Sequence, residues 1–93
     1  MPKRKLTKEE IQSRIENAAS ILREIATSRL IPRNIRRTAE EAIQSLYDEK
    51  YTPAVRAANA ISTLENVLYD PNMPSFARVK IWNAVSILET IRD

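Results

Sequence analysis

The chain contains no cysteine, no histidine and no glycine among its 93 residues. Without cysteine it has no disulfide, no thiolate nucleophile and no zinc–sulfur site. Without histidine it lacks the commonest general base and metal ligand. Without glycine it has no phosphate-cradling loop of the P-loop or dinucleotide type, and its helices must end without a left-handed glycine cap. The five prolines are therefore the residues that we expect to mark the helix boundaries.

Catalytic and cofactor patterns are missing too. The sequence shows no nucleophile–base pair, no paired catalytic carboxylates and no cofactor motif, so we expect a protein that is not an enzyme and binds no cofactor. A reaction based on lysine or carboxylate groups is the open alternative. The one dense acidic cluster is Glu40, Glu41, Asp48 and Glu49. Di-metal bundles need histidines with their glutamates, so we interpret this cluster as a solvated face rather than a magnesium site.

Long apolar runs are also absent. No apolar stretch reaches the roughly 18 residues of a membrane helix, so we expect no membrane association. The basic start of the chain leads into Glu9 and Glu10 rather than an apolar segment, which argues against a signal peptide and predicts a cytoplasmic protein. The net charge of +3 is by itself weak evidence for a nucleic-acid partner.

An internal repeat is what the sequence does contain. A shift of 42 positions lays the chain onto itself with nine identities over the 39 positions from Gln12 to Lys50. Ordinary composition predicts only about two or three by chance. The identical pairs are Arg14/Arg56, Asn17/Asn59, Ala18/Ala60, Ser20/Ser62, Leu22/Leu64, Pro32/Pro74, Arg36/Arg78, Ala42/Ala84 and Leu46/Leu88. The repeat therefore predicts one helical hairpin made twice.

Helical periodicity agrees with the repeat. Thr7 and Glu10 form a capping box that starts a helix ending near residue 28. Pro32 suits the first position of a helix that reaches about residues 48–50, and Pro74 that of a helix that reaches the C-terminus. Between them, Thr52 and Pro53 start a helix that ends near Tyr69. We predict an all-α protein: a basic flexible arm (1–6) and one four-helix, up-and-down bundle (7–93) of hairpins 7–50 and 51–93. The predicted buried stripes are Ile11, Ile15, Ala18, Leu22 and Ile25; Ile35, Ala39, Ala42, Ile43 and Leu46; Ala57, Ala60, Ile61, Leu64, Val67 and Leu68; and Ala77, Ile81, Ala84, Leu88 and Ile91.

The two hairpins differ in charge. Residues 8–50 hold 16 charged groups and residues 51–93 hold 8. Four positions that we expect to face outward change from polar to apolar between the hairpins. They are Asn34, Arg37, Glu40 and Ser45 in the first hairpin, and Phe76, Val79, Trp82 and Ile87 in the second. Because an exposed apolar strip signals a partner, we predict an interface of Val55, Phe76, Val79 and Trp82, most simply in a homodimer. The alternative is that the basic arm, or the loop around Leu30 and Ile31, covers the strip.

Basic residues offer a second candidate surface. The stretch from Ala26 to Ala39 has no acidic residue, and with the arm it supplies Lys3, Arg4, Lys5, Arg29, Arg33, Arg36 and Arg37 as a candidate phosphate-binding patch for RNA or DNA. No aromatic residue is interleaved for base stacking. The alternative is a solvated surface in which Arg36 and Arg37 pair with Glu40 and Glu41 one turn on.

Two segments resemble a known family. Residues 31–43 (IPRNIRRTAEEAI) and 70–89 (DPNMPSFARVKIWNAVSILE) are similar to the archaeal uncharacterised protein family 0147. The resemblance implies a small cytosolic archaeal protein with a bromodomain-like, four-helix up-and-down bundle. It implies no activity and no functional residues. The leading interpretation is a non-enzymatic helical interaction module that self-associates through the second hairpin, and the second is a small RNA- or DNA-associated protein.

Overall fold

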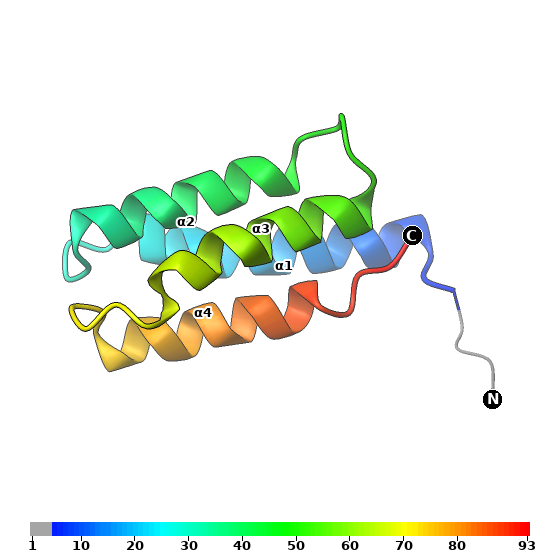
Figure 1. The fold of residues 1–93 in the computed structure, drawn as a ribbon. Coiled ribbons are helices and arrows are strands. Elements are labelled where there is room, and N and C mark those ends of the chain that lie inside the picture. The colour runs from blue at the N-terminus through cyan, green and yellow to red at the C-terminus, as the bar shows by residue number, and fades with distance from the viewer. Residues whose placement is uncertain (1–4) are drawn as a thin grey trace.

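Four helices, without strands, make up residues 5–93, the part of the chain that this computed structural model describes. They are α1 (Lys8–Thr27), α2 (Arg33–Leu46), α3 (Pro53–Leu68) and α4 (Ser75–Leu88). Figure 1 shows the α1–α2 and α3–α4 connections together at one end of the bundle, which we call the hairpin end. The α2–α3 connection, the start of α1 and the C-terminus lie at the other, which we call the terminal end. The predicted all-α, four-helix fold is confirmed.

The start of α1 is the capping box that the sequence predicts. The backbone N–H of Glu10 donates to the Thr7 hydroxyl oxygen at 3.1 Å, and the Thr7 N–H donates to a Glu10 carboxylate oxygen at 3.1 Å. Two of the unpaired donors at the helix start are satisfied in this way. The helix ends at Thr27 with Ser28 as its C-cap, where the sequence predicts the end.

The proline-led helices begin one residue later than predicted. Pro32 and Pro74 are extended N-cap residues rather than first-turn residues of α2 and α4. The carbonyl of each proline accepts the first helical hydrogen bonds. The Pro32 carbonyl, for example, accepts from the backbone N–H groups of Ile35 and Arg36. Only Pro53 occupies the first turn of its helix. A proline fixes φ near a value that both positions accept, so the ring alone does not distinguish them.

Two helix ends come earlier than predicted. The helix α2 ends at Leu46 rather than at residues 48–50, and α4 ends at Leu88 rather than at the C-terminus. Beyond α4 the chain turns so that Ile91 is buried, and the Arg14 guanidinium donates to the Thr90 carbonyl at 3.2 Å. No residue of 5–93 has a positive φ, in keeping with the lack of glycine caps.

The core consists of the predicted apolar stripes. Nearly all of those residues are buried, while Ile11, Ile43 and Ile61 are partly buried against them. Four buried residues lie outside the predicted stripes: Ala19, Ile31, Met73 and Val85. The bounds of α2 and α4 differ by 42 residues at both ends, as the sequence shift does. The buried residues correspond as well, in the pairs Ile35/Ala77, Ala39/Ile81, Ala42/Ala84 and Leu46/Leu88.

Packing between the helices is uneven. The helix α1 packs closely against α2 and α4, and α2 packs closely against α3, whereas α3 and α4 approach each other less closely. The second hairpin is therefore the looser of the two. No helix within residues 5–93 combines the length and hydropathy that crossing a membrane requires.

The C-terminal Asp93 caps α3 across the terminal end. The Thr52 hydroxyl donates to Oδ2 of Asp93 at 2.8 Å, and the Ala54 N–H donates to Oδ1 at 3.0 Å. The bond from Ala54, then the bond from Thr52, and last the charge of Arg56 hold the pKa of Asp93 below its ordinary value. All three favour the charged carboxylate.

A pH-dependent contribution to stability follows from this cap. Because the folded pKa lies below the unfolded pKa of about 4, the contribution is present above about pH 4 and is lost as the pH falls through the folded value. We expect Asp93→Asn to lower the midpoint of thermal unfolding at neutral pH, and this difference to shrink as the pH is lowered. Circular dichroism melts over a pH series measure it. The control is Glu89→Gln, which removes an exposed carboxylate at the end of α4. A deficit that stays constant with pH would contradict the prediction.

Candidate functional site

The outer face of α4 carries an apolar ridge. Phe76, Val79 and Trp82 expose 44%, 59% and 43% of their surface. A helix turns about 100° per residue, so side chains three apart form an oblique ridge, with Val79 on the side away from the buried Ala77 and Ala84. Of the four apolar positions predicted to face outward, these three face solvent in a single subunit, whereas Ile87 is partly buried against the core. We call the three exposed residues the α4 ridge.

No charged side chain interrupts this face. The two charged residues of α4, Arg78 and Lys80, are both partly buried. The exposed residues of α4 are all uncharged: Ser75, Phe76, Val79, Trp82, Asn83 and Ser86. Most surface helices carry charged residues opposite their buried stripe. The outer face of α4 therefore resembles the core of an interface more than an ordinary solvated surface.

Two polar contacts lie on the flanks of α4. The Lys80 ammonium lies 2.7 Å from a carboxylate oxygen of Glu24 on α1. On the other flank, Nε of Arg78 donates to the Leu68 carbonyl at 2.9 Å, and its Nη2 donates to the Asp70 carbonyl at 3.2 Å. These contacts join one flank to α1 and the other to the end of α3, and burial of Ala77, Ile81 and Ala84 keeps the α4 ridge on the outside. Arg78 also supplies donors to helix-end carbonyls that a glycine cap would otherwise satisfy.

Val55 lies apart from the ridge. It exposes 40% of its surface but belongs to the first turn of α3, which lies beside the last turn of the antiparallel α4. Along the bundle it is about 18 Å from Phe76. Tyr69, 80% exposed, ends α3 at the hairpin end, where α4 begins. The sequence carried a signal for Tyr69, because its counterpart in the first hairpin is Thr27.

The loop at residues 28–32 leaves the ridge uncovered. Ile31 of this loop is buried in the core, and Leu30 is 78% exposed. Asn34, at the start of α2, instead donates from Nδ2 to Asp70 at 3.1 Å and joins the two connections of the hairpin end. Within residues 5–93, the ridge is therefore left open. Residues 3 and 4 of the basic arm lie outside the described residues.

The arginines of α2 line a hollow on the first hairpin. Its volume is ≈ 230 Å³, and it is bounded by Ala26 of α1 and by Arg33, Arg36, Arg37 and Glu40. Within residues 5–93, neither Arg36 nor Arg37 forms an ion pair with Glu40 or Glu41 at 4 Å or less. The solvated-surface alternative with those pairs is therefore not the arrangement seen.

Arg36 differs from its counterpart Arg78. Nε of Arg36 is shielded from solvent and has no hydrogen-bond partner, whereas Nε of Arg78 donates to a carbonyl. The Arg36 side chain as a whole is only partly buried and lines the hollow. One repeat thus uses this arginine to satisfy the carbonyls of a helix end, and the other leaves its Nε without a partner.

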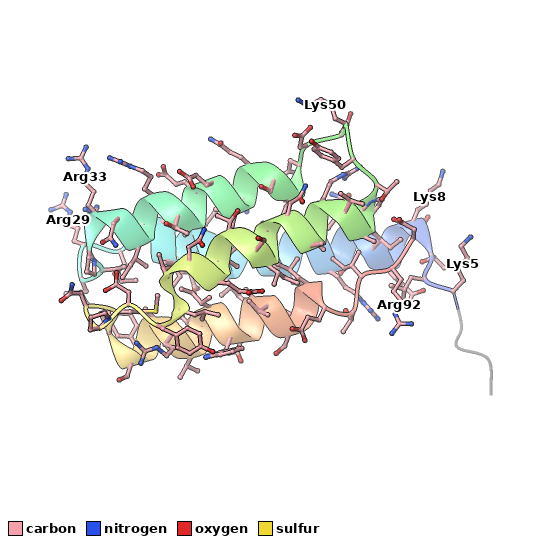
Figure 2. The ribbon with its side chains drawn as sticks, in the orientation of Figure 1. Lys5, Lys8, Arg29, Arg33, Lys50 and Arg92 are labelled. Carbon is pink, nitrogen blue, oxygen red and sulfur yellow. The ribbon has the colours of Figure 1, made fainter. Side chains whose placement is uncertain are left out.

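The basic arm and the basic segment do not form one patch. Figure 2 shows Arg29 and Arg33 at the hairpin end, and Lys5 with Lys8 at the terminal end. The 20 residues of α1 lie between them, a length of about 30 Å. Lys3 and Arg4 lie outside the described residues. Among the described candidate nucleic-acid residues, Lys5 is therefore separated from the arginines at the hairpin end.

Acidic residues make no candidate metal site in the described part of the chain. Across residues 5–93, no three acidic side chains come together in a way that could hold a metal ion. The predicted acidic cluster stands on the exposed side of α2 and on the loop that follows, as at Glu40 and Glu49.

Solved structures share this fold. The crystal structure of the unknown-function protein MMP1188 matches with a TM-score of 0.87 and 40% identity, covering 98% of this chain and all of that one. A protein of an uncharacterised family from Thermoplasma acidophilum matches with a TM-score of 0.83 and 25% identity, covering 90% of this chain and 99% of that one.

Sequence relatives agree with the structural matches. A protein of Saccharolobus islandicus is 52% identical over 82 residues, which are 88% of this chain and 92% of the relative. A protein of Desulfurococcus amylolyticus is 52% identical over 80 residues, which are 86% and 88% of the two chains. Both are UPF0147 proteins from archaea. The model of the Uncharacterised protein family (UPF0147) matches residues 2–91. With nearly its whole length matched in sequence and in fold, this chain belongs to the family UPF0147.

Proposed function

We propose that the protein is a non-enzymatic helical interaction module that forms a homodimer through the α4 ridge. The observation that carries this proposal is the uncharged outer face of α4, on which Phe76, Val79 and Trp82 stand exposed. Apolar area removed from water stabilises by about 25 cal/mol per Å². The matching face of α2 is polar, so the bundle itself does not require an apolar surface here.

A second copy of the chain suits this face better than a charged partner. The ridge offers no charge to complement, and like surfaces without charge do not repel. Its spacing is also self-complementary, because Phe76 and Trp82 lie three residues on either side of Val79. In an antiparallel pair of α4 helices with a twofold axis at Val79, each Phe76 lies opposite the partner's Trp82. Aromatic pairs of this kind add to the stability of an interface beyond their buried area.

Sedimentation equilibrium tests the proposal directly. We expect the measured mass to rise from one to two subunits as the concentration increases through the micromolar range. Trp82 is the only tryptophan, so its fluorescence reports on the ridge alone. We expect its emission to shift to longer wavelength on dilution, because the indole then becomes more exposed to water. A single-subunit mass throughout this range would reject the homodimer.

A cysteine at the twofold axis gives a positional test. Because the chain has no cysteine, Val79→Cys introduces the only thiol. Residues facing each other across the axis can approach within the Cα separation of about 7 Å that a disulfide requires. We expect Val79→Cys to form a disulfide-linked dimer under mild oxidation, measured by non-reducing gel electrophoresis. The matched control is Gln44→Cys on the outer face of α2, and equal rates for the two variants would contradict the proposed axis.

A further inference from the structure

Three arginines of α2 surround the hollow beside α1. Arg33, Arg36 and Arg37 are three and four residues apart and therefore share one side of the helix. With Ala26 and Glu40 they line an open hollow of ≈ 230 Å³. Three guanidinium groups and one carboxylate give this hollow a local charge of +2. Residues 26–39 contain no acidic residue.

This arrangement is unfavourable for the protein alone. Arg33 and Arg37 are like charges one turn apart, and such pairs destabilise a helix. Arg33 is also the first residue of α2, whose first turn contains no acidic residue. A helix N-terminus favours negative charge, so a cation there opposes the dipole. An anion bound in the hollow would relieve both repulsions.

The donors of Arg36 are consistent with a missing acceptor. Its Nε has no hydrogen-bond partner, although its repeat counterpart Arg78 uses Nε and Nη2 on two carbonyls. A guanidinium is a planar fork of five N–H donors that matches an oxyanion. Because Arg36 lines the hollow, an oxyanion bound there supplies acceptors to its guanidinium group.

We propose that Arg33, Arg36 and Arg37 form a binding site for a phosphate group, either free phosphate or the phosphodiester of a nucleic-acid backbone. The chemistry is shared by both sources, because each presents oxygens to a guanidinium fork. With no aromatic residue in 26–39, the site reads phosphate and not bases. The proposal does not depend on the homodimer, which uses α4.

The test compares two variants of equal charge. Arg33→Gln/Arg37→Gln removes the two exposed arginines and leaves the partly buried Arg36 in place. The control, Lys50→Gln/Arg92→Gln, removes two exposed cations at the terminal end, which Figure 2 shows far from Arg33. Each variant lowers the net charge from +3 to +1. Circular dichroism verifies that both keep their helices.

Two probes distinguish the sources. Inorganic phosphate is titrated while the arginine Nε–H signals are followed by NMR, and binding of a labelled oligouridylate is followed by fluorescence anisotropy at several salt concentrations. A response to phosphate that only the control variant keeps supports a free-phosphate site. A response to RNA alone supports a backbone site, with the slope of log affinity against log salt reduced by about 1.4 in Arg33→Gln/Arg37→Gln, for two lost contacts. Equal behaviour of the two variants, or no response to either probe, overturns the proposal.

Discussion

Val79→Arg is expected to convert the proposed homodimer to a monomer. At a twofold axis the substitution places two guanidinium groups face to face in an apolar surface. Juxtaposed like charges at an interface cost several kcal/mol. A loss of about 4 kcal/mol weakens the dimer roughly a thousandfold. Sedimentation equilibrium should then report one subunit at concentrations where the parent chain gives two.

The same substitution is expected to leave the fold intact. Val79 is 59% exposed, and arginine has a higher helix propensity than valine. The repeat counterpart of Val79 is Arg37, on the equivalent helix α2. We therefore expect the stability of the monomer to change by no more than about 0.5 kcal/mol, as measured by urea unfolding at low protein concentration.

Gln44→Arg is the matched control. It adds the same charge on the outer face of α2, which packs closely against α1 and α3 and not closely against α4. We expect this variant to dimerise like the parent chain. If Gln44→Arg weakens association as much as Val79→Arg does, then overall charge repulsion explains the effect and the ridge is not the interface.

The buried stripes could be predicted because they depend on local periodicity. Apolar residues three and four apart specify one face of a helix whatever its neighbours are. The repeat added a second, independent indication, since Ala42 and Ala84, or Leu46 and Leu88, occupy the same place in α2 and α4. The α4 ridge followed from the same comparison, because the positions that turn apolar in the second hairpin are outward positions of the first.

The helix ends could not be predicted as well because they depend on distant contacts. The helix α4 stops at Leu88, where the following residues leave to bury Ile91 and to place Asp93 on α3. The Arg14–Thr90 bond joins residues 76 apart in sequence. Nothing in the local pattern after Leu88 forbids another helical turn.

The basic surface shows the same limit. Charge counts along the sequence place Lys5 and Arg29 in one basic half, but a helix of 20 residues holds them at opposite ends of the bundle. The repeat likewise equates Arg36 with Arg78, although only Arg78 reaches helix-end carbonyls. Sequence identity fixed the position of this side chain on the helix but not the partner it finds.

Leu22→Ala is expected to be among the most destabilising single substitutions in the chain. Leu22 is fully buried in the second half of α1, the helix that packs closely against both α2 and α4. Truncating such a leucine removes transfer free energy and leaves a cavity, at a cost of about 3–5 kcal/mol. For a domain of this size each kcal/mol lowers the melting temperature by about 4–8 °C. Thermal unfolding followed by circular dichroism measures the loss.

Leu30→Ala makes the same chemical change on the surface and serves as its control. Leu30 is 78% exposed in the loop before α2, so we expect a change of no more than about 0.5 kcal/mol. The comparison also bears on function. If the ridge forms a dimer, Leu22→Ala lowers the melting temperature at every protein concentration, whereas Val79→Arg removes only its dependence on concentration. Similar losses for Leu22→Ala and Leu30→Ala would mean that α1 does not hold the bundle together as the packing indicates.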